Sequence, residues 1–179
     1  MTKNKIIIVF SGKQFSGKDT VAKILLNSFK TFKRVGIADA IKRKYSFDNG
    51  VSLSEIEKNK SLYRQDLINL GNWGRAKSPD FWLKEISQFD GNIIVTDVRM
   101  KHELNFFRSL GAFCIRVEAS IEARSKRGII ASSDDNTETE LDNISDWDYV
   151  IHNEGDYSEL EENSKLLVKS IINKYGDNL

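Results

Sequence analysis

The stretch at residues 6–20, IIIVFSGKQFSGKDT, constrains the fold of this chain more than any other part of the sequence. Residues 6–10 are all apolar, which is typical of a strand that is buried on both faces. Residues 12–18 follow directly with the spacing G-x-x-x-x-G-K, in which two glycines allow a tight turn whose N–H groups converge on phosphate oxygens. The sequence therefore predicts a strand, a phosphate-binding loop and a helix that starts at this loop.

The residues after this loop fit a helix that packs on the strand. Lys18 adds a positive charge to the phosphate site, while Val21 and Leu25 recur at helical spacing. The signature normally places Ser or Thr next to bind magnesium, but here Asp19 occupies that position and a hydroxyl follows one residue later at Thr20. A carboxylate can hold Mg²⁺ directly or through its water shell. An acidic residue is also favoured in a first helical turn, so both interpretations of Asp19 stay open.

The composition favours a globular chain with one compact domain at residues 1–179. Hydrophobic residues make up 40% of the chain and charged residues 30%, and the formal net charge is +1. A charge so close to zero argues against a protein that grips polymeric nucleic acid. Cys114 is the single cysteine, which excludes an intramolecular disulfide and favours the reducing cytoplasm. Apolar runs all stay below the roughly 18 residues of a membrane helix, so we expect no membrane partner.

Apolar strands alternate with helical segments along the chain. The expected strands are residues 6–10, 34–38, 92–97, 112–117 and 147–151. The expected helices are residues 19–26, 40–46, 54–59, 62–77, 80–89, 100–110, 120–128 and 157–175. We expect a turn over residues 45–53, around Asn49-Gly50, and we expect Pro79 to open the helix that follows it. The alternation predicts an α/β fold with a parallel sheet.

Two regions are placed to bind or cover a substrate. Residues 39–89 are largely helical, and they occur where a nucleotide kinase would insert the helices that bind its phosphate acceptor. Residues 131–143 are polar and have no core-forming periodicity. Together with the basic helix before them, they predict a lid over residues 120–143.

Ligands of open α/β sheets collect at the carboxyl ends of the strands. This rule brings together four segments, at residues 12–18, 39–42, 97–99 and 153–155. Transfer of a γ-phosphoryl group requires positioning and positive charge more than covalent chemistry from the protein. A phosphate loop with a metal, a lysine and several arginines would therefore suffice.

Four charged residues near these segments are candidates for such chemistry. Asp97, at the end of a predicted strand, fits a carboxylate that binds magnesium, orients water or contacts the acceptor, and it fits a helix N-cap as well. Arg99 suits an acceptor phosphate because a guanidinium binds phosphate in a bidentate manner. Arg124 and Arg127 lie on one predicted helix face and are placed to close on the β- and γ-phosphates; a solvated basic face explains them equally well.

Several motifs together resemble the phage-type deoxynucleoside monophosphate kinases and, equally, the animal-type phosphomevalonate kinases of the same P-loop kinase group. They are SGKQFSGKDT at residues 11–20, DVRMKHE at 97–103, LGA at 110–112 and DYVIHNEG at 148–155. The likeness covers nearly the whole chain and includes Thr137-Glu138 in the expected lid. It implies a P-loop NMP-kinase-like three-layer sandwich with a central parallel five-stranded sheet, a helical acceptor-binding region and a lid.

The resemblance also implies a role for each candidate residue. ATP would be bound by Gly12, Lys13, Ser16, Gly17, Lys18, Asp19 and Thr20, with Arg124 from the lid and Asn153 near the adenine. The acceptor would be bound by Asp39, Lys42, Arg64, Arg75 and Arg99. Lys18, Arg99, Arg127 and Asp97 would act in catalysis, and Asp19 and Asp97 would be the residues near Mg²⁺.

Two positions distinguish the families within this group. Phosphomevalonate kinases typically place arginines where this chain has Gln14 and Met100, and those cations suit an acceptor with a carboxylate as well as a phosphate. Their absence, together with His102-Glu103, favours ATP- and Mg²⁺-dependent phosphorylation of a deoxynucleoside 5′-monophosphate to the diphosphate. Phosphomevalonate kinase and a non-catalytic nucleotide-binding regulator stay open as alternatives, and a homodimer stays open as the oligomeric state.

Overall fold

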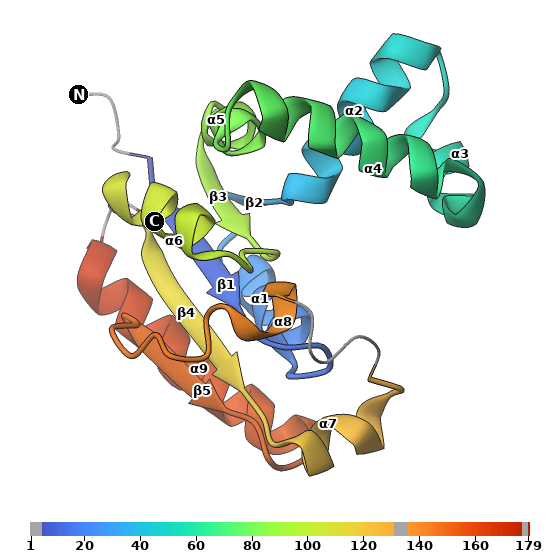
Figure 1. The fold of residues 1–179 in the computed structure, drawn as a ribbon. Helices are drawn as coiled ribbons and strands as arrows, with labels where there is room; N and C mark the ends of the chain where they lie inside the picture. The colour runs from blue at the N-terminus through green and yellow to red at the C-terminus, as the bar shows by residue number, and fades with distance from the viewer. Residues whose placement is uncertain (1–4, 131–135, 177–178) are drawn as a thin grey trace. The chain divides into compact units, whose positions relative to one another are not determined.

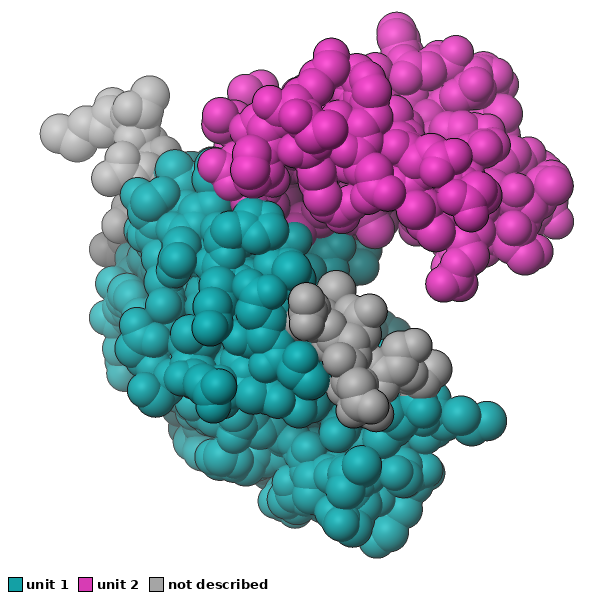
Figure 2. All heavy atoms as spheres, in the orientation of Figure 1, with its two compact units in different colours: residues 1–34, 90–179 teal, residues 35–89 magenta. Residues whose placement is uncertain are grey.

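The computed structural model describes residues 5–130, 136–176 and 179. The chain divides into two compact units, one made of Met1–Arg34 with Asp90–Leu179 and the other of Val35–Phe89 (Figure 2). Part of the expected lid, residues 131–135, lies outside the described residues. No helix in the described ranges combines the length and the apolar character needed to cross a membrane.

A five-stranded sheet forms the centre of the first unit (Figure 1). Its strands are β1 (Ile7–Ser11), β2 (Phe32–Val35), β3 (Asn92–Val95), β4 (Phe113–Glu118) and β5 (Tyr149–His152). The order is β2-β3-β1-β4-β5, and β1 runs parallel to β3 and β4, as β4 does to β5. All residues of β1 are buried, as expected for the central strand of a parallel sheet. The predicted parallel five-stranded sheet is confirmed.

Helices cover both faces of this sheet (Figure 1). The helices of the first unit are α1 (Lys18–Ser28), α6 (Lys101–Ser109), α7 (Ile121–Arg127), α8 (Asn136–Thr139) and α9 (Tyr157–Tyr175). On one face, Phe10 of β1 packs in a buried cluster with Leu25 of α1 and Leu167 of α9. On the other face α6 contacts β4 and buries Leu104 and Phe107. The three-layer sandwich is thereby confirmed.

The strand register brings the ends of three strands to one edge of the sheet. Ser11, the last residue of β1, pairs with Arg116 of β4, and Glu118 at the end of β4 pairs with His152 at the end of β5. Because the strands are parallel, the segments that follow them gather at this edge, where ligands of α/β proteins bind.

The second unit consists of α2 (Ile37–Asn49), α3 (Leu53–Lys58), α4 (Lys60–Lys77) and α5 (Phe81–Ser87). The buried indole of Trp82 explains why α4 continues through both of its glycines. Its Nε1 donates to the Gly71 carbonyl oxygen at 3.0 Å, and its ring lies where a Cβ of Gly74 would be. The tertiary contact therefore offsets the low helix propensity of glycine, which is about 1 kcal/mol per residue.

Several boundaries differ from the sequence prediction, and three of these differences concern the second unit and the strand that leads into it. The predicted strand at 34–38 lies two to three residues earlier, as β2, and α2 already begins at Ile37. The predicted turn over 45–53 is wrong for its first half, because α2 continues to Asn49 and ends at Gly50 in the left-handed conformation, with φ 66°. Pro79 precedes the N-cap Asp80 of α5, so it lies just outside the helix that it was expected to open.

Candidate active site

The P-loop, residues 12–17, joins β1 to the N-terminus of α1. Its two outer glycines are required by close approach of the surrounding chain. A Cβ on Gly12 would lie 2.6 Å from both the Ser16 Oγ and the Val117 carbonyl oxygen. Gly17 has φ 100°, and a Cβ there would collide with the side-chain amide of Asn153. Only glycine therefore fits at either end of the loop.

Phe15 holds the P-loop in an unusual conformation. Its φ is 60°, and it is the one non-glycine residue with positive φ in the described part of the chain. A bulky residue in this region costs of order 1–3 kcal/mol and persists only where neighbours enforce it. Its ring lies where a Cβ of Gly128 would be, and its carbonyl oxygen accepts from Arg127 Nη1 at 3.3 Å. Sequence reasoning did not single out Phe15, because phenylalanine is not a residue type that indicates a left-handed backbone conformation.

A cavity of about 380 Å³, which we call the phosphate cavity, opens where α1 begins. It is lined by Gln14, Phe15, Gly17, Lys18, Asp19, Thr20, Arg99 and Arg127. Lys18 is buried, and its Nζ lies 3.2 Å from Asp19 Oδ2. Three cations face one carboxylate here, so the cavity suits an anionic ligand. The structure thus brings Lys18 and Arg99 to one cavity, as the sequence led us to expect.

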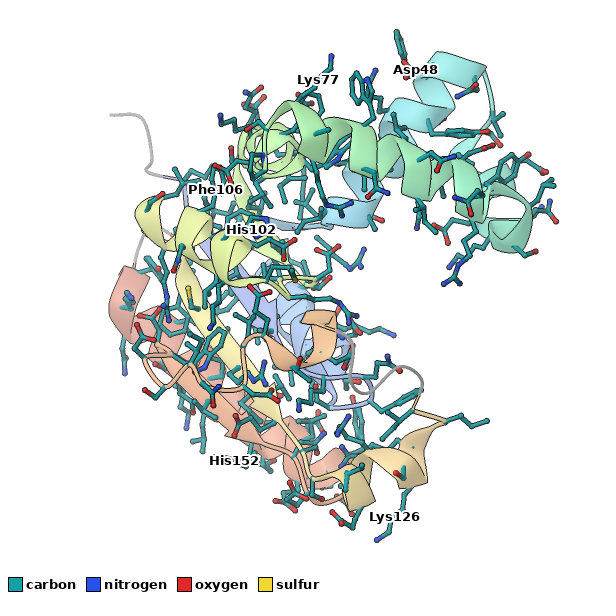
Figure 3. All side chains as sticks on the ribbon, in the orientation of Figure 1. Asp48, Lys77, His102, Phe106, Lys126 and His152 are labelled. Carbon is teal, nitrogen blue, oxygen red and sulfur yellow. The ribbon has the colours of Figure 1, made fainter. Side chains whose placement is uncertain are left out.

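A second cavity of about 400 Å³, which we call the base cavity, adjoins the first. It lies between α7 and the segment after β5, and it shares Gly17, Thr20 and Arg127 with the phosphate cavity. Lys126 of α7, which is exposed and labelled in Figure 3, is one of its lining residues. The two cavities are therefore neighbours at the start of α1.

Hydrogen bonds tie the walls of the base cavity together. The buried Asn153 donates from Nδ2 to the Ser16 carbonyl oxygen at 2.8 Å. Arg127 donates from Nη2 to the carbonyl oxygens of Asn153 at 2.8 Å and Gly155 at 3.0 Å. Arg127 thus links α7, the P-loop and the segment after β5. Ser16 is itself buried, and its hydroxyl lies beside Gly12 inside the loop.

Lys13 and Arg124 line a separate cavity of about 420 Å³ beside the P-loop. Lys13 Nζ forms an ion pair with Asp142 at 2.6 Å. Arg116 also pairs with Asp142, at 3.0 Å. Arg124 is buried and donates from Nη1 to the Gln14 carbonyl oxygen at 3.4 Å. The structure therefore does not bring Lys13 and Arg124 to the cavity of Lys18, and their contact with ATP stays a prediction.

Arg99 is held by a buried carboxylate that sequence reasoning gave no role. Its Nη1 forms an ion pair with Glu138 Oε1, and the Glu138 side chain is only 3% exposed. The other carboxylate oxygen of Glu138 accepts the Gln14 N–H at 2.9 Å. The one signal in the sequence was that Thr137-Glu138 belongs to the motifs of the resemblance.

Asp97 lies between β3 and α6 and is not among the residues that line the phosphate cavity. The N-cap of α6 is Met100, so the alternative role of Asp97 as the N-cap is wrong. Glu103 instead caps the N-terminus of α6, where its Oε2 accepts hydrogen bonds from the N–H groups of Arg99 at 2.8 Å and Met100 at 3.1 Å. Burial raises the pKa of Glu103, although these two N–H groups oppose that shift.

Asp19 is the carboxylate that fits a magnesium site best. It lines the phosphate cavity, and its side chain is 68% exposed. Mg²⁺ commonly binds through one or two carboxylates together with substrate phosphates and water. The two histidines lie on separate elements, α6 and β5 (Figure 3). Across the described residues, no group of three or more His, Cys, Asp or Glu side chains is arranged to hold a metal.

The second unit has a cavity of about 550 Å³ between α2 and α4, which we call the acceptor cavity. It is lined by Ala38, Ile41, Lys42, Lys60, Ser61, Arg64, Leu67, Ile68, Gly71 and Arg75. Lys42, Arg64 and Arg75 were predicted to bind the acceptor, and the structure brings them together. Lys60 joins them without having been singled out in the sequence.

Asp39 does not line the acceptor cavity, but its Oδ1 lies 3.8 Å from Lys42 Nζ. Lys42 also donates a hydrogen bond to Glu57, as Lys60 does. These two hydrogen bonds lower the pKa of Glu57 to about 2, and the bond from Lys42 has the larger effect. Two of the four basic residues that line this cavity, Lys42 and Lys60, are thus paired with a carboxylate outside it.

Comparison with known proteins identifies the class. A family model described as phosphomevalonate kinase matches residues 10–114, and one described as deoxynucleotide monophosphate kinase matches residues 66–164. Fold, P-loop and family matches define the chain as a P-loop kinase, that is, a nucleotide-dependent phosphotransferase. Each model spans more than half of the chain. The chain belongs to the P-loop kinase group that these two families represent.

Solved structures of other small-molecule kinases share the fold. Shikimate kinase from Aquifex aeolicus is 20% identical over 96% of this chain and 99% of its own, with a TM-score of 0.53. Shikimate kinase from Acinetobacter baumannii in complex with shikimate is 15% identical, with 96% of each chain covered and a TM-score of 0.58. APS kinase from Mycobacterium tuberculosis, with AMPPNP and APS, is 10% identical over 94% and 98%, with a TM-score of 0.52. At these identities the likeness establishes the fold.

Proposed function

We propose that this kinase transfers the γ-phosphoryl group of ATP to a deoxynucleoside 5′-monophosphate and releases the diphosphate. The observation that carries the proposal is that each unit has its own basic cavity. A kinase that joins two anions needs positive charge for both of them, whereas a passive ATP-binding regulator has no use for a second basic site. Residues 39–89 would then bind the acceptor, and residues 120–143 would form the lid, within a single kinase domain.

ATP would occupy the phosphate cavity and the base cavity of the first unit, which share Gly17, Thr20 and Arg127. The adenine would lie in the base cavity beside Asn153, and the triphosphate would pass Gly17 to reach Lys18 and Arg99 in the phosphate cavity. The N–H groups at the start of α1 would bind phosphate oxygens, since a helix N-terminus favours negative charge.

Asp19 would hold Mg²⁺ next to the donor phosphates, with water and phosphate oxygens as the remaining ligands. The metal would supply charge neutralisation for the transferring group. Asp97 stays a second candidate for the metal or for the acceptor.

Lys18, Arg99 and Arg127 would stabilise the charge that spreads over the transferring phosphoryl group. They line the same cavity, so their positive charge is in place before the reaction begins. A general base is not needed, because an acceptor phosphate oxygen is already a competent nucleophile. The protein would therefore act by positioning and by charge.

The lining of the acceptor cavity supports a deoxynucleotide. Its apolar side chains, Ile41, Leu67 and Ile68, suit a base and a deoxyribose, and Lys42, Arg64 and Arg75 suit a phosphate. Ser61 is the one lining residue that is neither basic nor apolar. A ribose 2′-hydroxyl against the apolar residues would lose a hydrogen bond to water without gaining a partner.

Phosphomevalonate is the second candidate acceptor, because the family model of that name covers both the P-loop and the acceptor cavity. A coupled assay of ADP release with the four deoxynucleoside monophosphates, their ribose counterparts and phosphomevalonate tests the choice. Faster turnover of deoxynucleotides than of ribonucleotides is expected. Turnover with phosphomevalonate alone would reverse the ranking, and no turnover with any acceptor would favour a regulator.

A further inference from the structure

We propose that Glu138 is a positioning residue, which holds Arg99 and the P-loop in place for phosphoryl transfer. The inference rests on the proposed function and assigns this residue a task within it. Glu138 lies in α8, within the C-terminal part of the expected lid and before β5.

The two oxygens of Glu138 serve two different parts of the site. Oε1 pairs with the guanidinium of Arg99, and Oε2 accepts the main-chain N–H of Gln14 in the P-loop at 2.9 Å. Both Arg99 and Gln14 line the phosphate cavity. One carboxylate thus joins the loop for the donor phosphates to the arginine predicted for the acceptor.

The burial of Glu138 makes this arrangement rigid. A carboxylate that is 3% exposed must be paired, because an unpaired charge in the interior is strongly unfavourable. Arg99 is 32% exposed and would otherwise sample many rotamers. The ion pair restricts it before the acceptor arrives, which lowers the entropy cost of binding and alignment. A guanidinium has five N–H donors, so others remain for a phosphate.

Neighbouring carboxylates show that anchoring of the segment does not depend on Glu138 alone. Glu140 Oε1 accepts the Lys101 N–H at 2.7 Å, and Asp142 pairs with Lys13 and Arg116. Glu140 lines none of the cavities described above, so Glu140→Gln is a matched control. It alters a carboxylate of the same segment but leaves the contact with Arg99 intact.

The test compares wild type, Glu138→Gln, Arg99→Gln, the double variant and Glu140→Gln. Glu138 uses one oxygen for Arg99 and the other for the Gln14 N–H, and an amide replaces one of these oxygens by an NH₂ donor, so Glu138→Gln loses one of the two contacts. We expect Glu138→Gln to lower kcat/KM for the acceptor at least tenfold, while the Kd for ATP, measured by calorimetry without acceptor, changes less than threefold. Glu140→Gln should stay within twofold of wild type in both.

The double variant separates positioning from a general structural effect. If Glu138 acts through Arg99, Glu138→Gln should cause little further loss in the Arg99→Gln background, because the ion pair is already absent there and the amide oxygen can still accept the Gln14 N–H. Multiplicative losses would overturn the inference. So would wild-type activity in Glu138→Gln, or increased activity, which would mean that Glu138 competes with the acceptor for Arg99.

Two further measurements keep the inference testable if Glu138→Gln fails to fold or if the proposed function is wrong. Glu138→Asp keeps the charge but is one methylene shorter, and we expect it to fold and to lose less activity than Glu138→Gln. If wild type turns over no acceptor, the proposed function fails independently. The Glu138–Arg99 coupling is then read from the melting temperatures of the same variants, where additive shifts overturn the inference and non-additive shifts support it.

Discussion

Asn153 donates its side-chain amide to the carbonyl oxygen of Ser16 at 2.8 Å and so connects the segment after β5 to the P-loop. The amide is buried and lies where a Cβ of Gly17 would be. The shape of the P-loop therefore depends on a residue more than a hundred positions away along the chain.

We expect Asn153→Ala to lower the free energy of unfolding by about 1–3 kcal/mol, since it leaves the buried Ser16 carbonyl without this donor. The KM for ATP should rise as well, because one of the contacts that join the P-loop to the wall of the base cavity is lost. Urea unfolding and steady-state kinetics measure the two effects. Asn173→Ala, on the exposed side of α9, is the control. Equal unfolding free energies for both variants would contradict the prediction.

Lys18→Ala should lower kcat by about 100-fold or more through loss of charge stabilisation in the transition state. Lys23→Ala removes the same charge from an exposed position of α1 and should leave kcat within twofold of wild type. Circular dichroism checks that both variants are folded. Retained wild-type turnover in Lys18→Ala would show that the phosphate cavity is not the site of transfer.

Gly74→Ala tests the packing of the second unit. Helix propensity alone would make the Gly74→Ala variant about 1 kcal/mol more stable than wild type. The new Cβ would collide with the indole of Trp82, which is 2% exposed and has no room to move, and such overpacking costs typically about 1–3 kcal/mol. We expect net destabilisation in urea unfolding, whereas Asn72→Ala on the exposed side of α4 should be within about 0.5 kcal/mol of wild type. A stabilised Gly74→Ala would refute the contact.

Cys114 should be inert in the native protein. Burial, followed by the nearby Asp148 carboxylate, raises the pKa of its thiol to about 11, so the reactive thiolate is scarce at pH 8. Mass spectrometry after treatment with iodoacetamide at that pH should detect almost no alkylation of the native chain and full alkylation in denaturant. Rapid native alkylation would mean that β4 opens far more often than its burial implies.

The parts of the fold that follow from local patterns could be predicted from the sequence. The strand before the P-loop and the helix after it are one such part, and Tyr157–Tyr175 has the predicted bounds because its apolar period and its N-cap Asp156 are both local. The extension of α2 to Asn49 was missed, since Asn49-Gly50 is typical both of a turn and of a helix end.

The candidate site could be predicted only as far as residue type determines function. The glycines and Lys18 of the P-loop could be predicted as site residues from their spacing, and Arg99 could be predicted from its position after a strand. Lys13 is held away from the phosphate cavity by its ion pair with Asp142, and Arg99 is held by its ion pair with Glu138. In each pair the two residues are more than 35 positions apart in the sequence. Such side-chain pairings depend on tertiary packing, which no local pattern encodes.

Phosphorus NMR of the wild-type protein with ATP, Mg²⁺ and a deoxynucleoside monophosphate tests the central claim most directly, because it follows donor and acceptor in one sample. The account predicts that loss of the γ-phosphate signal is matched by equal amounts of ADP and deoxynucleoside diphosphate. Consumption of ATP to ADP and free phosphate, with every monophosphate unchanged, would contradict it.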